Sequence, residues 1–181
     1  KEATIVHDCW KAHFQTQVDR HQTCTSHLER EAVYFEKRYK TPWPGSFRKM
    51  LMQAEKLKKK FTLDDYSSPN QARDELEKEL DALLEIPLNP KHKELVTFQK
   101  RIARYRDHIF TFLYHHDVPP DNNGSERAIR NVKVKQKISG QFKIFEAAEN
   151  FAILRSIIDT AIKNGQNVFL ALNTIADYKT N

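Results

Sequence analysis

The chain has 181 residues, which suits one domain or one core with an insertion. Its 39% hydrophobic and 30% charged residues are typical of a soluble globular protein, and no run of about 18 apolar residues predicts a membrane span. The net charge of +6 favours an acidic partner, most commonly nucleic acid. Two cysteines make no disulfide framework, so we expect reduced thiols and a cytoplasmic location.

Two short β-prone runs lie near the N-terminus. Residues 3–6 predict a buried strand that leads into His7 and Asp8. In open α/β sheets, ligands and catalytic groups gather at the carboxyl ends of strands, so Asp8 is a candidate site residue. Residues 10–18 predict a short helix, and residues 21–25 predict a second strand.

A helix is expected from Ser26, because Ser26 and Glu29 have the spacing of a capping box. It should run to about Tyr39. Three more helices follow between breakers, over about 45–61, 69–85 and 90–116. Apolar residues at helical spacing predict a buried face on the last of these: Leu95, Phe98, Ile102, Tyr105, Ile109, Phe112 and Leu113.

The segment PPDNNGSERAIR, residues 119–130, places Glu126 on the first turn of another helix. Asn122 and Asn123 are interpreted as residues that cap and orient this helix. From Arg127 to Lys143 there are six Lys or Arg residues and no acid. The pattern fits a metal-binding acid at the head of a phosphate-binding surface, or equally a capped, solvated helix.

The cations of this helix fall into two groups. Arg130, Lys133 and Lys137 follow Glu126 at helical spacing and share its face, so they are candidates for phosphate contacts. Arg127 and Lys135 lie off that face and are secondary candidates. Beyond them, residues 147–164 predict an apolar helix closed by Gly165, and residues 167–178 predict a last helix.

Other residue groups of the chain have either a functional or a purely structural interpretation. The spacing His21-x-x-Cys24-x-x-His27 supplies zinc donors but matches no standard finger. His27 and Arg30 begin the helix beside the Asp8 strand, where they would approach an active site or DNA. Neither cysteine has an adjacent base that would make it a nucleophile. The two tryptophans are expected in the core or an interface, and the lysines at 56–60 at a solvated helix end.

Four sequence blocks appear in the order found in one known family. They are VHDCW at 6–10, CTSHLERE at 24–31, DNNGSERAIR at 121–130 and KVKQKISG at 133–140. With them the chain closely resembles, over nearly its whole length, the transposases of the insertion-sequence-66 family. The catalytic domain of that family is of the ribonuclease-H-like DDE type, so the resemblance makes Asp8 the second acid of the triad and Glu126 the third.

The resemblance also implies a fold and a function. The fold would be α/β and predominantly helical, a partial ribonuclease-H-like fold that retains two short strands and carries an all-helical insertion. Residues 1–43 and 117–181 would form the core, and residues 44–116 the insertion. The function would be DNA strand cleavage and strand transfer with Mg²⁺ or Mn²⁺ held by Asp8 and Glu126, by a homo-oligomer on transposon ends and target DNA.

One departure from the family pattern limits these expectations. The first acid of the triad is an Asp on a strand upstream of Asp8, and the residues before Asp8 contain only Glu2, which is too close to Asp8 to replace it. We therefore expect a fragment that is inactive alone. Two alternatives remain open: a non-catalytic helical DNA-binding or assembly module in which Asp8 and Glu126 only cap, and a nuclease of the same fold.

Overall fold

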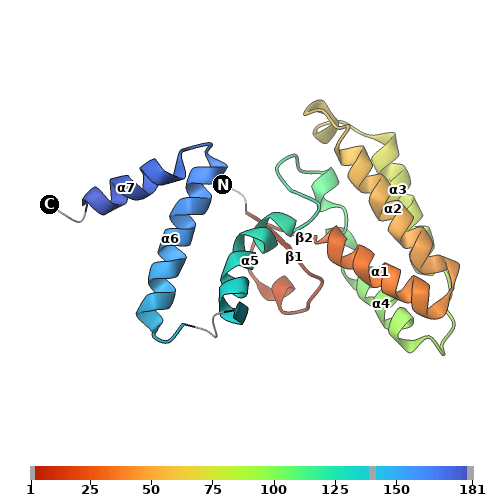
Figure 1. Cartoon of the computed structure of the whole chain (residues 1–181). Coiled ribbons are helices and arrows are strands. Elements are labelled where there is room, and N and C mark those ends of the chain that lie inside the picture. The colour runs from red at the N-terminus through yellow and green to blue at the C-terminus, as the bar shows by residue number, and fades with distance from the viewer. Residues whose placement is uncertain (1–2, 139–141, 179–181) are drawn as a thin grey trace. The chain divides into compact units, whose positions relative to one another are not determined.

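The computed structural model describes residues 3–138 and 142–178. Over these ranges the chain is predominantly helical with two short strands, as predicted (Figure 1). The strands and α-helices are β1 (Thr4–His7), β2 (Arg20–Thr23), α1 (Thr25–Tyr39), α2 (Pro42–Lys58), α3 (Gln71–Glu85), α4 (Lys93–Arg104), α5 (Asn123–Ile138), α6 (Phe145–Lys163) and α7 (Val168–Tyr178). Single 3₁₀ turns cover His13–Gln15, Asp64–Tyr66, Arg106–His108 and Thr111–Leu113. None of the helices described combines the length and apolarity needed to cross a bilayer.

The chain divides into two compact units, Lys1–Asn123 and Gly124–Asn181. Both strands and helices α1 to α4 belong to the first unit, whereas α5 from Gly124 onward, α6 and α7 make the second. The predicted assignment of residues 44–116 to an insertion in a ribonuclease-H-like core stays a prediction.

Strands β1 and β2 pair in parallel, with Thr4 opposite Arg20 and His7 opposite Thr23. Parallel neighbours need a crossover connection, which here is residues 8–19. The helix predicted over residues 10–18 is wrong: only a 3₁₀ turn forms, because Trp10 N donates to Asp8 O and His13 N to Trp10 O in successive tight turns. The crossover therefore stays a loop, and Trp10 is 63% exposed rather than in the core.

The core of the first unit lies where α2 packs against α1 and α3, and α3 against α4. Its largest fully buried side chains come from these helices and from the segment after α4: Leu28, Phe47, Met50, Leu51, Leu80, Leu95, Phe98, Ile102, Ile109, Phe110, Phe112 and Leu113. Trp43 is buried as predicted, and its indole N–H donates to Leu83 O at 2.7 Å. The buried tip of this aromatic thus has a polar partner.

The helix predicted over 90–116 is too long, since α4 ends at Arg104. The next residues bond to β2 instead of continuing the helix. Thr111 Oγ1 donates to His21 O at 2.6 Å, and Phe112 N donates to Gln22 Oε1 at 2.9 Å. The first bond gives the main-chain carbonyl of His21 a partner, and the second joins the Gln22 side chain to the segment after α4. The predicted apolar face is nevertheless buried on both sides of the break.

Helix α1 does not begin with the predicted capping box. Its N-cap is Cys24, and Ser26 already lies inside the first turn. The helix starts early because Thr25 is fixed at long range: Thr25 N donates to Pro120 O at 3.0 Å, and Thr25 Oγ1 to Glu55 Oε1 at 2.6 Å. The Ser26 hydroxyl instead accepts from Asn123 Nδ2 at 3.0 Å.

In the second unit, α6 packs against α7. Gly165 adopts a left-handed φ of 65° immediately after α6, which confirms its predicted role in ending the helix. Asn167 Oδ1 accepts from Phe169 N at 2.9 Å and so caps α7. Ala161 is the buried hydrophobic of α6 among the residues described, whereas Leu154 and Ile162 are half exposed or more.

Candidate functional site

Asp8 lies directly beyond the carboxyl end of β1, as the sequence predicted. Its carboxylate faces the ring of His13, with His13 Nδ1 2.6 Å from Asp8 Oδ1. This contact is an ion pair when His13 is protonated, and His13 Nδ1 also lies 3.4 Å from Asp8 O. Asp8 Oδ1 is shielded from solvent and accepts no hydrogen bond from the described residues. Asp8 thus holds an unsatisfied anionic oxygen beside a nitrogen donor, an arrangement that a cation would relieve.

His7 holds the main chain at this site. Its Nδ1 donates to Asp8 O at 2.6 Å, and its Nε2 lies 2.9 Å from His21 Nδ1. Burial lowers the pKa of His7, and the neighbouring His21 and His13 rings contribute to the shift. A neutral His7 that donates at Nδ1 must accept at Nε2, so both of its nitrogens are engaged.

Ligand atoms of His7, Asp8 and His13 all lie within 4.8 Å of one another. Among the described residues no other group of three His, Cys, Asp or Glu side chains comes together in this way. The zinc hypothesis for His21, Cys24 and His27 therefore finds no support. Sequence reasoning missed His13, although a histidine five residues after a strand-terminal Asp could have drawn attention to it.

Both cysteines are free thiols, as predicted, and both are buried. Burial raises the pKa of Cys9 to about 11, which leaves it protonated at neutral pH. Burial also raises the pKa of Cys24, whose Sγ accepts from Asn122 N at 3.3 Å. Neither group has the lowered pKa that a nucleophilic thiolate requires.

A pocket of about 460 Å³ opens at the start of α1. Its lining combines polar and charged side chains with one valine: Ser26, Glu29, Arg30, Val33, Arg48 and Asn123. Burial raises the pKa of Glu29, with a further contribution from Glu55. Arg30, predicted to bind DNA, lies at this pocket, whereas His27 is not part of its lining. Arg48 is a cation that sequence reasoning missed.

Asn122 precedes α5, Asn123 is the first residue of that helix, and both belong to the first unit. Besides the bond from Asn122 N to Cys24, Asn123 N donates to Asp121 Oδ1 at 2.9 Å, and Asn123 Nδ2 reaches the Ser26 hydroxyl. These contacts fix the chain just before Glu126. The capping role predicted for the two asparagine side chains stays a prediction.

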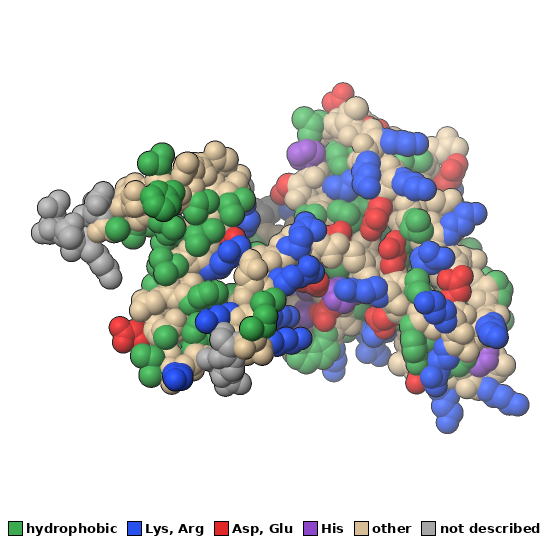
Figure 2. All heavy atoms as spheres, in the orientation of Figure 1, with side chains coloured by type: hydrophobic (Ala, Val, Ile, Leu, Met, Phe, Trp, Pro, Cys, Tyr) green, Lys and Arg blue, Asp and Glu red, His purple; other side chains and the backbone are tan. Residues whose placement is uncertain are grey.

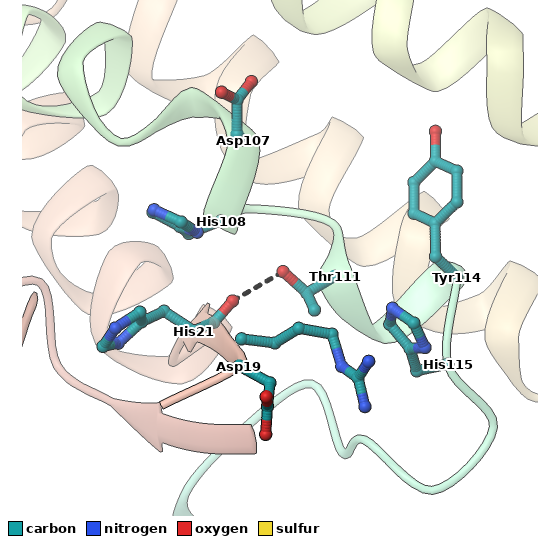
Figure 3. Close-up of a pocket in the computed structure, with 8 residues that line it drawn as sticks. Asp19, His21, Asp107, His108, Thr111, Tyr114 and His115 are labelled. Carbon is teal, nitrogen blue, oxygen red and sulfur yellow. Dashed lines mark hydrogen bonds between the residues drawn. The ribbon is translucent and has the colours of Figure 1, made fainter. Parts of the chain in front are cut away.

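A second pocket, of about 250 Å³, lies beside the first residues of β2 (Figure 3). It is lined by Asp19, Arg20, His21, Asp107, His108, Thr111, Tyr114 and His115. The lining includes two aspartates, one arginine and three histidines, and the Thr111 hydroxyl donates to His21 O (Figure 3). Burial lowers the pKa of His108, and the neighbouring His21 lowers it further.

Glu126 lies in the first turn of α5, as predicted, and is half-buried. The predicted cations of this helix, Arg127, Arg130, Lys133, Lys135 and Lys137, are all exposed. Figure 2 shows blue Lys and Arg side chains over α5. Glu2 and the Ser139-Gly140 end of the basic block lie outside the described residues.

Comparison with known proteins identifies the chain as a transposase. A family model of transposases, described as Transposase IS66 family, matches residues 1–150. Because this match covers most of the chain, the chain belongs to the IS66 transposase family. Membership means an enzyme of the transposase type, with DNA as substrate and a divalent metal as the general requirement. Neither a curated protein nor a solved structure matches the chain significantly.

Proposed function

We propose that this chain carries two of the carboxylates used in metal-dependent DNA strand cleavage and strand transfer, Asp8 and Glu126. The observation that carries the proposal is Asp8 Oδ1, a solvent-shielded carboxylate oxygen without a hydrogen bond at the end of a strand. When bound, a divalent cation would supply the positive charge that favours the attacking hydroxyl and the leaving oxygen of a phosphodiester.

The chain's own residues would prepare the site for that ion. His7 fixes the main chain of Asp8 through the bond from Nδ1 to Asp8 O, which orients the carboxylate. Asp121 fixes Asn123 N at the start of α5, three residues before Glu126. The main chain at Asp8 and the main chain just before Glu126 are thus each fixed by local hydrogen bonds within the first unit.

The DNA backbone would be bound by the exposed cations of α5. Arg130, Lys133 and Lys137 recur on one side of the helix, within a run from Arg127 to Lys143 that contains no Asp or Glu. Contacts of this kind contribute affinity and positioning but little base specificity. Arg30, at the pocket on α1, and His27 are additional candidates.

The catalytic part is tested by a transposition assay with the protein expressed from its natural gene. Asp8→Asn and Glu126→Gln should each lower strand transfer in Mn²⁺ about a thousandfold, since metal stabilisation of the transition state is worth several kcal/mol. Asp64→Asn, at an exposed acid in the first unit, is the matched control. Activity retained in either site variant would refute the assignment, and cut ends without joined DNA would indicate a nuclease.

The DNA-binding part is tested by salt titration of duplex binding. Replacing Arg130, Lys133 and Lys137 by Gln should reduce the slope of log affinity against log salt by about 2–3, because each phosphate contact contributes about 0.9. The control variant replaces three exposed lysines of the first unit by Gln and so removes the same charge. They are Lys91, in the connection before α4, and Lys93 and Lys100 in α4. An equal reduction of the slope in both triple variants would mean that only the overall charge matters. It would refute the proposal that the α5 cations bind the DNA backbone.

A further inference from the structure

The crossover between β1 and β2 places His13 next to the carboxylate of Asp8. A metal site made of oxygen ligands alone would have no such nitrogen. His13 Nδ1 lies 2.6 Å from Asp8 Oδ1, so two atoms that can both bind a metal ion are adjacent. Asp8 Oδ1 accepts no hydrogen bond from the described residues, and its contact with His13 is an ion pair only when that ring is protonated, so a bound cation would take the place of the ring proton. An anionic oxygen and a ring nitrogen thus face the same small space.

We propose that Asp8 and His13 bind one divalent transition-metal ion together, through a carboxylate oxygen and an imidazole nitrogen. This inference rests on the proposed role of Asp8 and adds a ligand that changes which ions the site prefers. Imidazole suits cobalt, nickel and zinc, whereas Mg²⁺ binds hard oxygen ligands and keeps several waters. The site should therefore bind Co²⁺ or Ni²⁺ more tightly than Mg²⁺.

His7 supports this pair without being a third ligand. Both of its ring nitrogens are engaged, with Asp8 O at 2.6 Å and His21 Nδ1 at 2.9 Å. Its ring is buried and packs edge-on against His13, at 5.1 Å between centroids. His7 is thus a positioning residue that orients the Asp8 main chain and the His13 ring.

Trp10 provides a built-in reporter for an ion at this position. Its ring lies edge-on to His13 at 5.2 Å between centroids, and the side chain is 63% exposed. The chain has two tryptophans, and the other, Trp43, is buried in the core. A paramagnetic ion on His13 should quench the Trp10 emission, and Trp10→Phe should remove that response.

The test is a Co²⁺ titration of the whole 181-residue chain, followed by Trp10 fluorescence and independently by calorimetry. His13→Gln should weaken Co²⁺ binding about tenfold or more. The weaker affinity for Mg²⁺, measured by its competition with Co²⁺, should stay unchanged. His116→Gln replaces an exposed histidine elsewhere in the first unit and should leave both affinities unchanged. Asp8→Asn should weaken both ions.

Two results would overturn the inference. The first is Co²⁺ binding as tight in His13→Gln as in the unchanged chain, and the second is Co²⁺ binding no tighter than Mg²⁺. If Asp8→Asn alone loses metal, His13 is not a ligand but the proposed function stands. If neither variant changes metal binding, the metal role of Asp8 fails as well. Because His13 is partly exposed, His13→Gln should fold, and unchanged circular dichroism checks this.

Discussion

Gln22 is the residue on which the position of β2 depends most directly. Its fully buried side chain donates from Nε2 to Thr23 O at 2.6 Å and to Ile109 O at 3.0 Å. Its Oε1 accepts from Phe112 N at 2.9 Å. Gln22→Leu keeps a similar volume but leaves the Ile109 carbonyl and the Phe112 N–H without these partners.

Each buried polar group left unpaired costs about 1–3 kcal/mol, so Gln22→Leu should lower the free energy of unfolding by about 2–5 kcal/mol. Urea unfolding followed by tryptophan emission measures this, because both tryptophans lie in the first unit. The matched control is Gln53→Leu, at an exposed position of α2, which should change stability by less than about 0.5 kcal/mol. A loss no larger than the control's would refute the reasoning.

Three further predictions concern other buried groups of the first unit. Lys58 Nζ donates to the carbonyls of Phe112, His115 and His116, so Lys58→Met should destabilise by about 1–3 kcal/mol in urea unfolding, unlike Lys59→Met at an exposed site. Burial and the neighbouring His21 lower the pKa of His108 in the folded chain, and Asp107 opposes the shift only in part. On acidification His108 therefore binds its proton at a higher pH in the unfolded chain than in the folded one. The free energy of unfolding should therefore fall between pH 7.5 and 5.5, and it should fall less in His108→Asn than in the unchanged chain. An equal fall in both chains would contradict this prediction. With a pKa of about 11, Cys9 should react with iodoacetamide at pH 8 far more slowly in the folded chain than in urea, and equal rates would be contrary evidence.

Local sequence signals predicted most of the elements but not where long-range bonds interrupt them. The apolar spacing from Leu95 to Leu113 predicted the buried face, yet it could not reveal the end of α4. Thr111 and Phe112 leave the helix to bond to β2, which lies about 90 residues earlier in the chain. Ser26 likewise lost its predicted capping role because Pro120, distant in sequence, fixes Thr25.

The candidate site could be predicted only where it depends on strand ends and helix starts. Asp8 and Glu126 occupy such positions, so pattern alone pointed to both. His13 could not be found in this way, because a helix was expected where the crossover makes turns that bring the ring back to Asp8. Arg48 reaches its pocket only through the packing of α2 on α1.

The register of the parallel pair has a consequence for how related chains can differ in length. Ile5 lies opposite His21, and side chains alternate along each strand, so one inserted residue in β2 would exchange the faces of His21 and Gln22. His21 would then lose His7, and Gln22 would lose the segment after α4. Insertions and deletions among relatives should therefore gather in residues 16–19, between the 3₁₀ turn and β2, and be absent from the strands.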